Sequence, residues 1–87
     1  MSLLFVMLNS VEIAHEWMKL GAALVAVIAV FGAAYGISTI AKSAIDNIAR
    51  QPEAGGDLRS SMVVAAALIE GITFFALVIV LLTLFVN

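Results

Sequence analysis

Residues 20–41 read LGAALVAVIAVFGAAYGISTIA, a run of 22 residues without a charged side chain. About 20 apolar residues are enough for an α-helix to cross the hydrocarbon core of a bilayer. This run therefore predicts a membrane-spanning helix. Towards the C-terminus, residues 60–87 form another apolar segment, in which Glu70 is the single charged residue. We expect this segment to be a second spanning helix.

The composition agrees with a protein whose solvent is lipid. Apolar residues make up 64% of the 87 residues and charged residues 11%, whereas soluble domains have about 45–50% and about 25%. A water-soluble domain of this length would lack the polar groups that it needs on its surface. The chain has no cysteine and no long basic cluster. We therefore expect no disulfide, metal site, cofactor or nucleic acid partner.

The segment between the two apolar runs is polar and predicts a turn. Residues 42–59, KSAIDNIARQPEAGGDLR, hold six of the ten charged residues together with Pro52 and the pair Gly55-Gly56. Because backbone groups cannot stay unpaired in hydrocarbon, we expect two helices joined by a short loop. Proline cannot continue a helix, so helix 1 should end just before Pro52. The expected fold class is an all-α, two-helix transmembrane hairpin.

The chain, residues 1–87, is expected to form one domain. Its expected parts are an N-terminal extension and start of helix 1 at 1–19, helix 1 at 20–50, a polar loop at 51–56 and helix 2 at 57–86. Asp57 is a suitable N-cap for helix 2, because a carboxylate can accept hydrogen bonds from the first free N–H groups of a helix.

The distribution of basic residues predicts the orientation of the hairpin. Lys42, Arg50 and Arg59 flank the loop, whereas Lys19 is the one basic residue on the terminal side. The positive-inside rule then places the loop in the cytoplasm and both termini on the opposite side, where Trp17 suits the interface. The N-terminus also lacks the character of an organellar transit peptide. We therefore expect a multi-pass protein of a bacterial inner membrane.

Small residues follow two sides of helix 1. One stripe contains Ala22, Ala26, Ala29, Gly32, Ala33 and Gly36, and the roughly opposite stripe contains Ala23, Ala34, Ser38 and Ala41. Two stripes allow close approach from both sides, as in a closed ring of identical subunits. The general abundance of Ala and Gly in membrane helices explains the pattern equally well. Helix 2 carries bulky apolar residues over 74–86 and is expected to face lipid.

Glu70 is the candidate for chemistry. It lies about 20 Å along helix 2 from Asp57, deep in the hydrocarbon. An ionisable side chain there costs about 2.5–3.5 kcal/mol even on a lenient scale, so it is seldom present without a use. Because desolvation disfavours the charged form, we expect Glu70 to be protonated when it faces lipid. Glu70 is therefore interpreted as a proton carrier, and the alternative is a glutamic acid that only hydrogen-bonds a neighbour.

The level of Glu70 in the hairpin can be matched with helix 1. Counting equally from Pro52 places Ala34 opposite Glu70, so the region from Ala34 to Ser38 should face it. The hydroxyl groups near this level, which could support the ion site, belong to Thr73, Tyr35 and Ser38. For Thr73 and Ser38, a hydrogen bond from the hydroxyl group to the backbone of their own helix is an equally good explanation. For Tyr35, ordinary packing is an equally good explanation.

These features together resemble the c subunit of the rotary ATP synthase. The resemblance is carried by the hairpin, the small residues Gly32, Ala34, Gly36 and Ser38 at alternate positions, the loop Ala49-Arg50-Gln51-Pro52-Glu53 and Glu70. It implies a ring of identical subunits in membrane lipid, with its small residues in the ring packing. Ala34 and Ser38 stand where the family usually has glycine, and residues 1–19 have no clear counterpart in the motif.

The resemblance also implies partners and a function. The carboxyl group at the Glu70 position is loaded and unloaded at the stator a subunit, which supplies an arginine, and this couples ion transport to ring rotation and ATP synthesis. The loop Arg50-Gln51-Pro52 would dock on the central stalk. Such a subunit transports ions and is not an enzyme.

The choice of ion depends on two positions. In sodium-coupled members of the family, a glutamine on helix 1 and a hydroxyl residue after the carboxylate contribute ligands; here the corresponding residues are Ile37 and Gly71. Neither can bind sodium through its side chain, so the proton is the expected ion. Sodium held by Glu70, Thr73 and main-chain oxygens is the alternative.

Two other classes of function compete with transport. A scaffold or pore-forming hairpin would need the small-residue stripes but not Glu70. An enzyme is disfavoured because no nucleophile, base and orienting group are clustered, and His15 stands alone near an interface.

Overall fold

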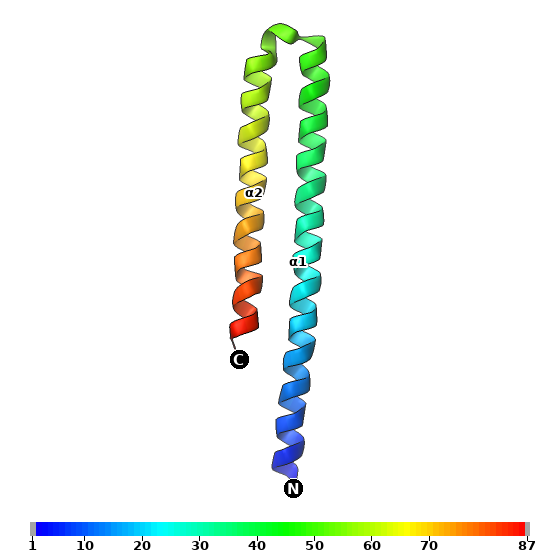
Figure 1. Cartoon of the computed structure of the whole chain (residues 1–87), viewed down its shortest axis with the longest axis vertical. Helices are drawn as coiled ribbons and strands as arrows, with labels where there is room; N and C mark the ends of the chain where they lie inside the picture. The colour runs from blue at the N-terminus through cyan, green and yellow to red at the C-terminus, as the bar shows by residue number, and fades with distance from the viewer. Residues whose placement is uncertain (1, 87) are drawn as a thin grey trace.

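The computed structural model describes residues 2–86 and shows a helical hairpin. Helix α1 spans Leu3–Arg50, the short 3₁₀ helix η1 spans Pro52–Ala54, and helix α2 spans Gly55–Phe85. Figure 1 shows α1 and α2 lying antiparallel side by side, with both termini at the end opposite the turn. The prediction of an all-α hairpin is confirmed. Both helices are long and apolar enough to cross a membrane.

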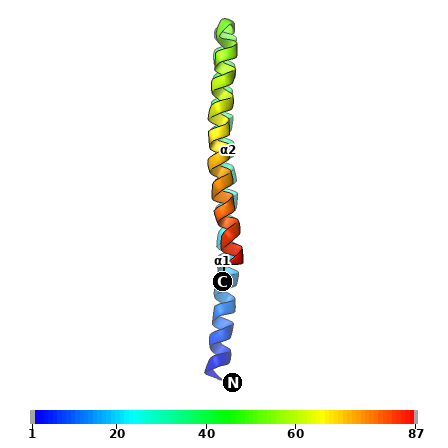
Figure 2. The same ribbon diagram turned by 90° about the vertical axis from the view of Figure 1, so that its left-hand side faces the viewer.

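The hairpin is a flat rod without a core of its own. The Cα trace measures 76 × 16 × 7 Å along its principal axes, and the edge-on view in Figure 2 shows a single layer of two helices. Among residues 2–86, no hydrophobic side chain is buried. The exposed apolar surface is therefore available to lipid and to further subunits.

The turn is formed by Gln51 and η1. The residue before a proline avoids the α-helical region, and Gln51 has a non-helical conformation with φ −133° and ψ 72°. Its N–H still donates to the carbonyl oxygen of Asn47 at 2.9 Å, and the N–H of Ala54 donates to the carbonyl oxygen of Gln51 at 2.9 Å. Pro52 then begins η1, where its missing N–H costs nothing.

The helix boundaries differ from the expected ones mainly at the start of each helix. Residues 3–19, expected as an extension leading into helix 1, are helical throughout, because neither proline nor glycine interrupts them. Helix α2 begins at Gly55, two residues before the expected start. The prediction that Asp57 caps this helix is wrong: the N-cap residue is Ala54, and Asp57 lies in the first turn. There its negative charge still interacts favourably with the positive end of the helix dipole.

The two helices contact each other along rows spaced three and four residues apart. On α1 the partly covered residues include Ala22, Ala26, Ala29, Ala33, Gly36, Ile40, Ala44 and Ile48; on α2 they include Leu58, Met62, Ala65, Ile69, Thr73, Ala76 and Val80. Through the middle of the hairpin α1 contributes mainly small residues to this seam, which lets the two backbones approach closely. Gly36 is the clearest case, because a Cβ atom there would lie 3.3 Å from Cδ1 of Ile69.

Gly55 can be tested by substitution. It is the one buried residue among residues 2–86, yet its φ of −58° and ψ of −39° are helical. A Cβ atom there would lie 3.6 Å from Cγ2 of Ile48, an ordinary van der Waals contact. Since alanine also reduces the freedom of the unfolded chain, we expect Gly55→Ala to stabilise the helical state by up to about 1 kcal/mol. Thermal unfolding followed by circular dichroism would check this, and a clear loss of stability would contradict it.

Candidate ion-binding groove

Glu70 lies in an open groove between the two helices. The groove has a volume of about 300 Å³ and is lined by Val30, Ala33, Ala34 and Ile37 of α1 and by Glu70, Thr73, Phe74 and Leu77 of α2. Ala34 and Glu70 thus share one groove, at the level that equal counting from Pro52 indicates. Glu70 brings the one acidic group and Thr73 the one hydroxyl group to a lining that is otherwise hydrocarbon.

The groove follows from helix periodicity and residue size. Thr73, Phe74 and Leu77 are three, four and seven residues after Glu70, so they lie on the same side of α2. Opposite them, Ala33 and Ala34 are too small to fill the space beside the carboxyl group. Next to this level, the close approach of Gly36 to Ile69 holds the helices together.

Glu70 lacks a partner within the hairpin. Among residues 2–86, its carboxyl group has neither a side-chain hydrogen bond nor an ion pair, and its side chain is exposed in the single hairpin. Residues 2–86 contain two ion pairs, which lie near the two ends of the uncharged run 20–41. They join Lys19 to Glu16 at 3.7 Å and Lys42 to Asp46 at 3.1 Å. The described part of the single hairpin therefore places no countercharge beside Glu70.

The three hydroxyl residues selected from the sequence have different positions. Thr73 lines the groove, and its hydroxyl group donates to the carbonyl oxygen of Ile69 at 2.7 Å. Its oxygen can still accept a hydrogen bond. Tyr35 is 77% exposed and does not line this groove. Ser38 lines another depression, nearer the turn. The hairpin alone thus brings only Thr73 to the groove of Glu70.

Much of the groove wall was not predicted from the sequence, namely Val30, Ala33, Phe74 and Leu77. The signal for Phe74 and Leu77 was present, because both follow Glu70 at helical spacing. The groove-lining residues of α1 could not be predicted without knowing how the two helices are rotated relative to each other. That rotation depends on how the small residues of α1 pack against α2.

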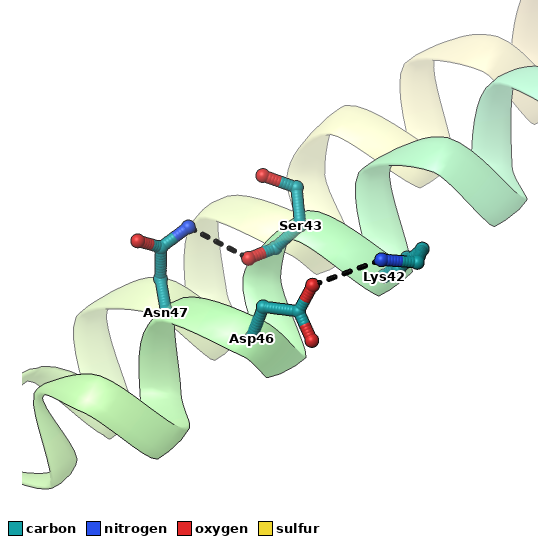
Figure 3. A network of polar contacts seen from close by, with 4 residues as sticks. All are labelled: Lys42, Ser43, Asp46 and Asn47. Carbon is teal, nitrogen blue, oxygen red and sulfur yellow. Dashed lines mark hydrogen bonds and ion pairs between the residues drawn. The ribbon is translucent and has the colours of Figure 1, made fainter.

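The turn-proximal part of α1 carries a polar face. Figure 3 shows Lys42 paired with Asp46, and the Nδ2 group of Asn47 donating to the carbonyl oxygen of Ser43 at 2.7 Å. Beyond this face, the side chains of Arg50, Gln51 and Pro52 are exposed at the tip of the hairpin. The tip is therefore open to contact by other proteins.

Comparison with known proteins agrees with this geometry. Residues 20–83 match the family model for the C subunit of ATP synthase. An ATP synthase c subunit from Phocaeicola vulgatus is 58% identical over 67 residues, which cover 77% of this chain and 80% of the relative. Another from Bacteroides thetaiotaomicron is 52% identical over 83 residues, or 95% and 98% of the two chains. A third, from a Synechococcus strain, is 41% identical over 68 residues, or 78% and 83%.

Two long apolar helices joined by a short turn define a two-helix membrane hairpin. The family match covers the turn and the membrane-spanning parts of both helices. The chain belongs to the family of ATP synthase c subunits. It is thus part of the membrane rotor, it forms a c-ring with its own copies and works with other ATP synthase subunits, and it is not itself catalytic. The named relatives are bacterial, and this chain is a bacterial membrane protein.

Proposed function

We propose that this rotor protein carries protons across the membrane and that Glu70 is the proton-binding group. The observation that supports this most directly is the groove itself, in which an unpaired carboxyl group faces hydrocarbon from both helices. A carboxyl group in such surroundings is stable when neutral and needs a polar or cationic partner when ionised. These are the two states between which a proton carrier alternates.

The mechanism follows from this alternation. A stator arginine favours the ionised form of Glu70, and return of the hairpin to lipid requires proton uptake from the other side. Each elementary charge that crosses 100 mV provides about 2.3 kcal/mol. Since one such step is far too small for ATP synthesis, many copies in a ring must act in turn.

The lining of the groove favours the proton over sodium. A sodium ion prefers several oxygen ligands, but the described side chains offer only the Glu70 carboxylate and the Thr73 hydroxyl group. Ile37 contributes hydrocarbon at one position where sodium-coupled relatives have a ligand, and Gly71 contributes no side chain at the other. Main-chain oxygens would have to complete a sodium site.

Labelling with a carbodiimide tests the choice of ion. The reagent modifies protonated carboxyl groups, so it should label Glu70 in isolated rings at neutral pH. We expect labelling to fall as the pH rises and to be insensitive to added sodium chloride at constant ionic strength, with potassium chloride as the control. Protection by sodium but not by potassium at neutral pH would overturn the proton assignment.

The supporting residues have distinct proposed roles. Thr73 accepts a hydrogen bond from protonated Glu70, while Tyr35 and Ser38 could reach a carboxyl group only in a neighbouring copy. Gly36 packs against α2, whereas a Cβ atom on Gly32 would have no neighbour within 4 Å. Gly32, with the exposed residues Ala34 and Ser38, is therefore free to pack against the next hairpin of the ring.

The exposed tip is proposed to dock the ring on the central stalk through Arg50, Gln51 and Pro52. Lys42 and Arg59 lie near the same end as Arg50, while Lys19 lies near the termini. By the positive-inside rule the tip faces the cytoplasm and both termini the opposite side of the bacterial inner membrane.

A further inference from the structure

Helix α1 continues well beyond the end of α2. A shallow depression joins His15, Met18 and Lys19 of α1 to Thr83, Leu84 and Val86 at the end of the other helix. Residues 3–14 therefore project past α2 as a single helix, about 18 Å long. Figure 1 shows this part of α1 extending alone below the C-terminus. The family model begins at Leu20 and does not include it.

The projecting segment is strongly apolar at its far end. Leu3, Leu4, Phe5, Val6, Met7 and Leu8 follow one another, and each is between 55% and 74% exposed. Leu4, Leu8 and Val11 have the spacing i, i+4, i+7, and they continue the row with which α1 contacts α2 further along. In this segment, however, there is no α2 to cover that row.

The bilayer does not cover the segment either. Between it and the spanning run lies a polar band that includes Asn9, Glu12, His15, Glu16 and Lys19. The middle of Leu3–Leu8 lies about 20 Å beyond Lys19 along the helix axis. With neither proline nor glycine between Leu3 and Leu20, the helix runs straight through the band. Its apolar end is thus carried beyond the lipid interface.

In a ring, the neighbouring copies of this segment lie along the two flanks of the Leu4–Leu8 row, where Phe5 and Met7 are exposed. In a c-ring the α1 helices of adjacent subunits are parallel, and packed helices lie about 8–10 Å apart. Residues 3–14 prolong α1 without a break, so the same segments of adjacent copies start side by side. We propose that they pack against one another as a collar of parallel helices outside the membrane, a second contact that holds the ring together. The collar rests on ring formation and is independent of the role of Glu70.

Cysteine cross-linking tests the collar, and the chain has no native cysteine. Phe5 and Met7 point to opposite flanks of the Leu4–Leu8 row, since two residues differ by about 200° around a helix. In a ring, one flank of each copy faces the other flank of the next. The double variant Phe5→Cys/Met7→Cys should therefore form a ladder of disulfide-linked multimers on oxidation in membranes. The matched variant Phe5→Cys/Asn9→Cys, with both residues on one flank, should not form it.

The outcomes separate the collar from other arrangements. If the oxidised Phe5→Cys/Met7→Cys rings yield monomers alone, the proposal is overturned. That result would fit segments that bend back onto the lipid surface. As a second measurement, rings with Phe5→Ser and Met7→Ser, which replace the apolar residues on the two flanks, should dissociate at a lower temperature than unchanged rings, whereas Asn9→Ser rings should not. An unchanged dissociation temperature would also count against the collar. The same ladder in a Glu70→Gln background would show that the collar does not depend on proton transport.

Discussion

Replacing Glu70 with glutamine should reduce proton flux through the rotor to background while the ring still assembles. The glutamine side chain has nearly the same size and fits the groove formed with Ala34, Thr73 and Phe74. It can still form hydrogen bonds, but it can neither lose nor gain a proton at neutral pH. Packing is thus retained and the ionisable group is removed.

The measurement uses membrane vesicles that contain the rotor and its stator, with an imposed potential and a fluorescent pH indicator. Glu53→Gln is the matched control, because Glu53 is an exposed carboxyl group in η1, away from the groove. We expect its proton flux to stay close to that of the unchanged protein. Undiminished flux in the Glu70→Gln rotor would rule out Glu70 as the carrier.

Replacing Gly36 with valine should weaken the hairpin beside the groove. A Cβ atom at this position would lie 3.3 Å from Cδ1 of Ile69, so two further methyl groups would displace the Ile69 side chain and, with it, α2. Overpacking of this kind typically costs about 1–3 kcal/mol. Because Ile69 precedes Glu70, the shift would also move the carboxyl group, and proton flux should fall together with stability.

Gly21→Val is the matched control for this effect. It adds the same atoms to the same helix, but a Cβ atom on Gly21 has no neighbour within 4 Å. Thermal unfolding followed by circular dichroism, together with proton flux in vesicles, should distinguish the two variants. Equal stability of the Gly36→Val and Gly21→Val proteins would show that close helix contact at Gly36 is unimportant.

The sequence was sufficient for the main architecture because each feature depends on local composition. The uncharged run at 20–41 predicts one spanning helix, Pro52 predicts the turn, and the apolar segment around Glu70 predicts the other helix. Since the connection is short, counting residues from Pro52 was enough to bring Ala34 to the level of Glu70.

Other features needed three-dimensional information. Asp57 was chosen as a cap from its residue type, but η1 allows α2 to begin earlier, at Gly55. The walls of the groove depend on the rotation of one helix about its axis relative to the other. Neither Tyr35 nor Ser38 could be excluded from the groove of Glu70 by counting alone, because residues at one level can point in different directions.

The unbroken course of α1 has a mechanical consequence. Arg50, beside the exposed tip, and Ala34, beside Glu70, belong to one continuous helix. Its backbone hydrogen bonds make it stiff against bending, and it contains no hinge between these two points. A sideways force applied to α1 at the groove is therefore transmitted to the tip along a single helix.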